Sequence, residues 1–181
     1  TGIFNDNSNW ENGVLYISNC LVDAKESLSG AYTIKNGTRI IADGAFRDCS
    51  SLTSVTIPSS VTSIEGGALH GCTSLTSVTI PNSVTKLNCG AFDNTGIFND
   101  NSNWENGVLY ISNCLVDAKE SLSGAYTIKN GTRIIADGAF RDCSSLTSVT
   151  IPSSVTSIEG GAFMDCKALT NVTISNGVMK I

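Results

Sequence analysis

A long internal duplication constrains the fold of this chain more than any other feature of its sequence. Residues 1–68 recur without a change as residues 95–162, at an offset of 94 positions. A shorter repeat of 23 residues lies within each copy, so that residues 41–63 align with residues 64–86. Because repeats of this length bury their apolar side chains only against their neighbours, the pattern predicts an elongated solenoid rather than a compact enzyme.

The repeat unit has the apolar spacing of a leucine-rich repeat. Its shared pattern reads Ile-x-x-Gly-Ala-Phe/Leu-x-x-Cys-x-x-Leu-x-x-Val-x-Ile-Pro/Ser-x-x-Val. Val55 and Ile57 alternate with polar residues, which predicts a short strand with one buried face. We expect such strands to stack in parallel about 4.8 Å apart and to end at prolines such as Pro58, which lack a backbone donor. The fold class is therefore a β-rich leucine-rich-repeat solenoid.

The return segments of the repeat predict turns. Residues 66–69 read Gly-Gly-Ala-Leu and residues 160–163 read Gly-Gly-Ala-Phe. Glycine permits a tight turn, and the leucine or phenylalanine fills the core from the side opposite the strand. Because these segments are short and the α-rich repeat classes have longer periods, we expect turns or 3₁₀ pieces rather than full helices.

One stretch in each block of 94 residues departs from the repeat. Residues 95–125, which copy residues 1–31, open with a polar, turn-rich sequence that predicts a loop instead of a rung. Two β-favouring runs follow at residues 108–111 and 115–118, and they predict a hairpin with Cys114 at its tip.

The atypical stretch is expected to rejoin the repeat without ending the domain. We expect Trp104 to hold the hairpin against the flank of the solenoid, and Tyr126 takes the place of a strand valine. We therefore predict one continuous solenoid over residues 1–181, composed of superrepeats 1–94 and 95–181.

Charge and hydropathy exclude several classes of partner. The net charge of −5 and pI of about 4.7 argue against nucleic acid or an anionic membrane, because both attract clustered lysine and arginine. No apolar run approaches the ~20 residues of a spanning helix, so we expect no membrane insertion in this segment. The first residues lack a signal-peptide pattern, and neither terminus has the polar surface of a solenoid cap. We expect a fragment of a longer array, with ends that favour end-to-end self-association.

The seven cysteines follow the repeat rather than a metal-binding pattern. Those at the Phe-x-x-Cys position are Cys49, Cys72, Cys143 and Cys166. At that position we expect a buried thiol that acts as a small apolar side chain. With no Cys-x-x-Cys pair, zinc is not expected, and we predict neither a metal nor a cofactor. A disulfide between Cys89 and Cys114 stays open as an alternative.

Other chemistry-bearing residues favour structural interpretations. His70 is replaced by Met164 in the second copy, which leaves no histidine base there and favours a solvated turn residue. The polar cluster at residues 6–11 lacks the residue order of a calcium loop, so we favour a hydrogen-bonded loop. Glycosylation sequons begin at Asn36, Asn130 and Asn171. The Asn-Gly pairs in the first two favour plain turns.

Outward-facing strand positions are the remaining candidates for a binding site, and most of them carry hydroxyl groups. They are Thr53, Ser54, Thr56, Thr76, Ser77, Thr79, Thr147, Ser148, Thr150, Thr170, Asn171 and Thr173. Threonine suits an exposed strand without any ligand, yet the exposed sheet of a solenoid commonly binds partners. Few aromatic or arginine residues accompany the stripe, which predicts weak contacts strengthened by multivalency.

The sequence resembles the BspA-type leucine-rich repeats. The resemblance rests on residues 135–157, which contain Ala139-Phe140, Cys143, Leu146, Val149, Ile151-Pro152 and Val155, and it spans nearly the whole chain. The Trp-Glu-Asn-Gly-Val-Leu-Tyr segment is also similar to an element found in these proteins. The resemblance implies an extracellular protein at the cell surface or cell wall, often one involved in adhesion, and it supplies no catalytic residues.

Three functions remain open at this stage. The leading hypothesis is a non-enzymatic interaction module whose repeated surface binds a host or extracellular-matrix protein. A structural spacer or wall-layer component is the alternative. Carbohydrate binding by the threonine stripe is weaker, because glycan sites usually offer stacking aromatic rings.

Overall fold

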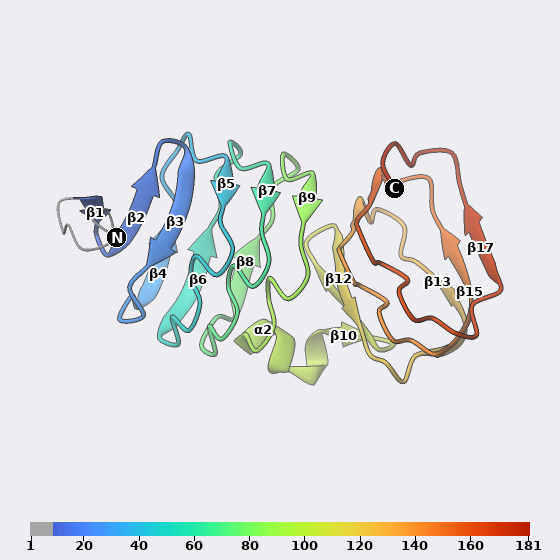
Figure 1. Ribbon diagram of the computed structural model, residues 1–181. Coiled ribbons are helices and arrows are strands. Elements are labelled where there is room, and N and C mark those ends of the chain that lie inside the picture. The colour runs from blue at the N-terminus through green and yellow to red at the C-terminus, as the bar shows by residue number, and fades with distance from the viewer. Residues whose placement is uncertain (1–8) are drawn as a thin grey trace. The chain divides into compact units, whose positions relative to one another are not determined.

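The structure, a computed structural model, describes residues 9–181 and consists mainly of short strands joined by turns (Figure 1). Its contacts divide the chain into two compact units. The first runs to Thr85 and includes Gly90–Asn101, and the second comprises Lys86–Cys89 and Ser102–Ile181. Each unit is a β-solenoid of the predicted class, because successive rungs add one strand to each of two sheets. A single continuous solenoid over residues 1–181 stays a prediction.

In the first unit, the order of the strands explains how the atypical stretch joins the repeats. One sheet begins with five strands of this unit in the order β1-β2-β3-β5-β7. They are β1 (Trp10–Glu11), β2 (Val14–Ile17), β3 (Cys20–Ala24), β5 (Ile40–Ile41) and β7 (Ser63–Ile64). Its first three strands pair antiparallel, whereas β3, β5 and β7 pair in parallel. The other sheet is wholly parallel and contains β4 (Gly30–Thr33), β6 (Leu52–Thr56) and β8 (Ser77–Thr79).

The second unit repeats this arrangement. Its antiparallel-to-parallel sheet contains β10 (Trp104–Glu105), β11 (Val108–Ile111), β12 (Cys114–Ala118), β14 (Ile134–Ile135) and β16 (Ser157–Ile158). Its parallel sheet contains β13 (Ser123–Thr127), β15 (Ser145–Ile151) and β17 (Asn171–Ile174). The strand β9 (Lys86–Leu87) also belongs to this unit. The predicted parallel stacking is confirmed, and Pro152 directly follows β15 as expected.

The third side of each rung is a stack of turns, as the glycine-rich return segments predict. Backbone hydrogen bonds join successive turns: the N–H of Phe46 donates to Ala68 O at 2.7 Å, and that of Leu69 to Ala91 O at 2.8 Å. Phe46, Leu69 and Phe140 are fully buried. The three sides thus enclose a core to which both the strands and the turns contribute.

The predicted hairpin is confirmed, but its place in the fold was not foreseen. Strand β12 begins at Cys114 and pairs in parallel with β14, through Cys114 with Ile134 and Leu115 with Ile135. Cys114 is buried and is the first residue of β12, so its placement at the hairpin tip was wrong. The turn uses Ser112 at a φ of 56° and ends one residue earlier than predicted. The hairpin therefore supplies a rung of the sheet instead of lying on its flank.

The loop predicted before the hairpin is partly regular. The short helix α2 (Gly96–Asn99) begins where the Thr95 hydroxyl accepts the Phe98 N–H at 3.1 Å, as expected for an N-cap. A 3₁₀ turn, η2 (Asn101–Asn103), follows and leads into β10. Trp104 lies in that strand, opposite Leu109. No helix among residues 9–181 is long and apolar enough to cross a membrane.

Candidate functional site

The predicted binding positions lie on the parallel sheet of each unit, and we call these twelve residues the Thr/Ser ladder. They occupy β6, β8, β15 and β17, or directly precede one of those strands. Ser54 and Ser148 are half-buried, whereas the other ten positions are exposed. Val55 and Val149, between them, are buried. The alternation of inward and outward residues is therefore confirmed in β6 and β15, whereas all four residues of β17 are exposed. Binding by the ladder residues stays a proposal.

The strand register aligns the ladder across neighbouring rungs. Ser54 lies opposite Ser77 and Thr56 opposite Thr79 in the first unit. In the second unit the pairs are Ser148 with Asn171 and Thr150 with Thr173. Rows of like side chains therefore run across the strands, as the repeat period of 23 residues requires.

The ladder extends one strand further than the sequence predicted. Thr33 in β4 lies opposite Thr56, and Thr127 in β13 lies opposite Thr150. Both residues are exposed. The sequence contains a signal for this extra strand, because Tyr-Thr-Ile in the atypical stretch aligns with Val-Thr-Ile in the next repeat. Each unit thus carries a row of three threonines, formed by residues 33, 56 and 79 in the first unit.

The first ladder position next to β17 is partly committed to the backbone. The Thr170 hydroxyl donates to Thr147 O at 3.3 Å, while the Thr170 N–H donates to the same oxygen at 3.0 Å. The corresponding Thr76 N–H donates to Thr53 O at 3.1 Å. We therefore expect the second and third positions, exemplified by Ser77 and Thr79, to offer a partner more hydrogen-bonding capacity than the first.

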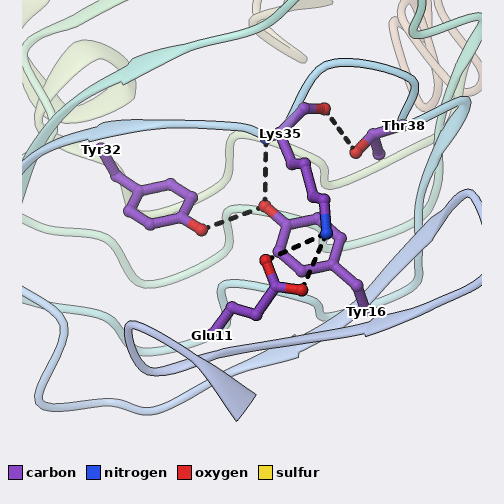
Figure 2. Close-up of polar contacts among 5 residues, drawn as sticks. All are labelled: Glu11, Tyr16, Tyr32, Lys35 and Thr38. Carbon is purple, nitrogen blue, oxygen red and sulfur yellow. Dashed lines mark hydrogen bonds and ion pairs between the residues drawn. The ribbon is translucent and has the colours of Figure 1, made fainter. Parts of the chain in front are cut away.

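A polar cluster missed by the sequence analysis joins the hairpin to the parallel sheet in the first unit (Figure 2). The hydroxyls of Tyr16 in β2 and Tyr32 in β4 lie 3.0 Å apart, and the Lys35 N–H donates to the Tyr16 hydroxyl at 3.2 Å. The Lys35 ammonium donates to Glu11 at 2.8 Å and lies 5.7 Å from the centre of the Tyr16 ring. We call these four residues the tyrosine cluster.

The second unit contains the same cluster at positions shifted by 94. The hydroxyls of Tyr110 and Tyr126 lie 3.0 Å apart, and Lys129 bonds Glu105 at 2.9 Å. Burial, followed by the hydrogen bond to Tyr110, raises the pKa of Tyr126 well above its usual value. The phenol of Tyr126 therefore stays protonated at neutral pH. Because the ion pair between Lys129 and Glu105 is more than half exposed, it contributes little to stability.

The cysteines occupy the positions expected of small apolar residues. Cys49, Cys72 and Cys143 are fully buried, and Cys166 is half-buried. The Cys72 thiol donates to Phe46 O at 3.1 Å, and burial raises its pKa to about 12. None of the seven cysteines forms a disulfide in the described residues, so the alternative disulfide between Cys89 and Cys114 is not formed.

The remaining candidates fall in turns. His70 lies half-buried in the turn side of its rung. Asn36 and Asn130 precede glycines with a φ of 88°, which confirms the predicted turns. In the first of these turns, the Thr38 hydroxyl is buried and donates to Lys35 O at 2.7 Å. Residues 6–8 of the polar cluster at residues 6–11 lie outside the described residues. Among residues 9–181, no group of three or more acidic, histidine or cysteine side chains is placed to hold a metal ion.

Comparisons with solved structures find leucine-rich-repeat proteins of bacteria. The chain is 25% identical to the leucine-rich-repeat protein TpLRR of T. pallidum, with a TM-score of 0.48. The alignment covers 90% of this chain and 76% of that one. A leucine-rich cell surface protein of Faecalibacterium prausnitzii is also 25% identical, with a TM-score of 0.32. That alignment covers 83% of this chain and 60% of the other. A leucine-rich-repeat protein of Bacteroides ovatus is 21% identical, with a TM-score of 0.42. The alignment covers 93% of this chain and 51% of that protein.

The family assignment rests on the sequence repeats themselves. A search of curated proteins found no match. The family model described as "BspA type Leucine rich repeat region" matches residues 24–123 and 118–181, with six copies of the repeat. These ranges cover most of the chain and include the strands that carry the Thr/Ser ladder. The chain therefore belongs to the BspA-type leucine-rich-repeat family.

Proposed function

We propose that this chain is a non-enzymatic protein-binding module of a bacterial cell surface or cell wall, and that the Thr/Ser ladder contacts its partner. The observation that carries the proposal is the register of the ladder. Thr33, Thr56 and Thr79 follow one another across three parallel strands, with each side chain exposed. A partner that recognises one rung meets the same groups on the next.

The ladder favours many weak contacts over one tight site. It lacks the tryptophan, tyrosine and arginine side chains that dominate compact protein interfaces. Its hydroxyls both donate and accept hydrogen bonds, and they can match the backbone groups of an extended segment. Because the two units carry identical β6 and β15 sequences over 52–56 and 146–150, a partner with repeated epitopes gains avidity. A host or extracellular-matrix protein fits this description, and adhesion is the biological role that we propose.

A binding assay with the whole chain tests this function. Immobilised collagen, fibronectin and laminin serve as probes, and the proposal expects saturable binding to at least one of them. The double variant T56R/T150R places a long cation in the row of each unit and should weaken binding at least tenfold, on the order of 1.4 kcal/mol or more. Both positions are exposed, so folding should be unaffected.

The matched control carries the same charges away from the ladder. The double variant N36R/N130R adds arginines in exposed turns and should bind as the parent does. Equal loss in both double variants would show that added charge alone disrupts binding. If the parent shows no saturable binding to any probe, the chain is better described as a structural spacer.

A further inference from the structure

A cleft outside the Thr/Ser ladder is lined by aromatic, acidic and basic side chains together. It lies in the first unit and has a volume of about 500 Å³, within the range of small-ligand sites, which is roughly 300–1,000 Å³. Its functional side chains are Trp10, Asp23, Lys25, Glu26, Arg47 and Asp48. They come from the short strand β1, the end of β3 and the turn stack, so three parts of the rung meet here.

Several contacts hold these side chains at the cleft. The Lys25 ammonium lies 5.4 Å from the centre of the Trp10 ring, an attractive cation–π distance. An Asp23 carboxylate oxygen accepts the Ala24 N–H at 2.9 Å. Burial first, and then the charges of Asp23, Glu26 and Asp48, raise the pKa of Cys49 to about 11. The three carboxylates therefore lie near enough to the Cys49 thiol to act on its pKa.

The chemistry of this lining suits a neutral polyhydroxyl ligand better than an ion. Three carboxylates accept hydrogen bonds, while one lysine and one arginine donate them. Lys25 and Arg47 would repel a simple cation, and the carboxylates would repel a simple anion. A sugar hydroxyl both donates and accepts, so it can use both sets. Trp10 supplies an apolar ring against which the C–H face of a pyranose can pack.

We infer that this cleft binds a short neutral glycan, through a surface separate from the Thr/Ser ladder. The inference goes beyond the proposed protein-binding function and does not depend on it. Trp10 packs against the sugar ring, Lys25 donates to hydroxyls at the same ring, and Glu26 and Asp48 accept hydroxyl protons. The Thr/Ser ladder offers none of these stacking groups.

The second unit carries the same residues in the same relation. The counterparts of the six side chains are Trp104, Asp117, Lys119, Glu120, Arg141 and Asp142. The Lys119 ammonium lies 5.2 Å from the centre of the Trp104 ring. The charges of Asp117, Glu120 and Asp142 again contribute to a raised pKa of the thiol in this rung, that of Cys143, after burial and Cys166. The side chains that would hold a glycan in the first unit are therefore all present in the second unit as well.

The intrinsic fluorescence of the folded chain tests this inference, because Trp10 lines the cleft and the other tryptophan of the chain, Trp104, occupies the equivalent position in the second unit. Neutral oligosaccharides of glucose, galactose, mannose and N-acetylglucosamine are titrated to about 10 mM, above the ~1 mM dissociation constant that corresponds to about −4 kcal/mol. We expect a saturable fluorescence change with at least one of them. Calorimetry should give two sites for each chain, and one site in Trp10→Ala.

A conservative variant guards against misfolding. E26Q/E120Q changes exposed side chains, removes one charged acceptor from each cleft and should weaken glycan binding about tenfold. The T56R/T150R variant of the ladder should bind the glycan as the parent does, so failure of one site is distinguishable from failure of the other. A flat response to all four sugars overturns the inference, and so does a saturable response to an oligoarginine peptide alone.

Discussion

The hydroxyl groups of Tyr16 and Tyr32 lie 3.0 Å apart and join β2 of one sheet to β4 of the other. Tyr110 and Tyr126 repeat this contact at the same distance. Tyr16 belongs to the hairpin, whereas Tyr32 occupies the strand position that Val55 fills in the next rung. The pair therefore fastens the atypical part of each block to the regular part.

Removing the Tyr16 hydroxyl should destabilise the chain more than removing that of Tyr32. Tyr16→Phe loses both the bond to Tyr32 and the bond from the Lys35 N–H, whereas Tyr32→Phe loses only the former. We expect losses of about 1–2 kcal/mol and about 1 kcal/mol in the free energy of unfolding. Urea denaturation followed by circular dichroism measures both.

The matched pair in the second unit provides the control. Tyr110→Phe and Tyr126→Phe should show the same order of effects, because their contacts are the same. Unchanged stability in both Tyr16→Phe and Tyr110→Phe would mean that water replaces the cluster without loss.

The regular rungs could be predicted from the sequence because their physical signal repeats. The alternation around Val55 and Ile57 fixed the buried face of β6, and the copies at a spacing of 23 residues required parallel neighbours. The glycines of the return segments predicted the turns, and Gly67 adopts a φ of 57°. Local period and turn chemistry were sufficient for these elements.

Other elements have no such local signal. Strands β5 and β7 are two residues long, too short to show a period. Helix α2 has four residues and only Thr95 as a cap signal. The contact between Tyr16 and Tyr32 joins residues that belong to different sheets, and neither the cleft at Trp10 nor the burial of Cys114 follows from spacing. Such features depend on which strands the fold places side by side.

Gly96 should tolerate no larger residue. A Cβ atom at this position would lie 2.8 Å from Leu75 O and 2.9 Å from Thr73 O, and these backbone atoms cannot move aside as side chains do. We expect Gly96→Ala to lower the free energy of unfolding by about 1–3 kcal/mol. Thermal or urea denaturation measures the change.

Gly160 supplies the comparison for that experiment. Its nearest neighbour would lie 3.8 Å from an added Cβ atom, and its φ is not in the left-handed region. Gly160→Ala should therefore be neutral or slightly stabilising. Equal destabilisation by both substitutions would indicate a general effect of the added methyl group and not the close approach at Gly96.

The buried thiols should make the fold sensitive to high pH. Burial raises the pKa of Cys49 to about 11 and those of Cys72 and Cys143 to about 12, from an ordinary value of 9.0. Below pH 9 both folded and unfolded thiols are protonated, so the full stability is present. Between about pH 9 and 12 only the unfolded thiols lose protons, and the stability falls.

Alkylation of the native chain measures the same protection residue by residue. Because Cys89 is exposed, iodoacetamide should modify it at pH 8.5 well before Cys49, Cys72 and Cys143, as read by mass spectrometry. Rapid modification of these three in a chain that remains folded would contradict their burial.

The central claim is that the Thr/Ser ladder of each unit binds the same partner. Thr56 and Thr150 occupy identical positions in β6 and β15, so T56R and T150R should each weaken binding to a matrix protein several-fold. If both ladders act together, the double variant should weaken it by more than the product of the single effects, because avidity is lost. Surface plasmon resonance with the parent, the single variants and the double variant measures this directly. Binding by the double variant at the affinity of the parent would contradict the account.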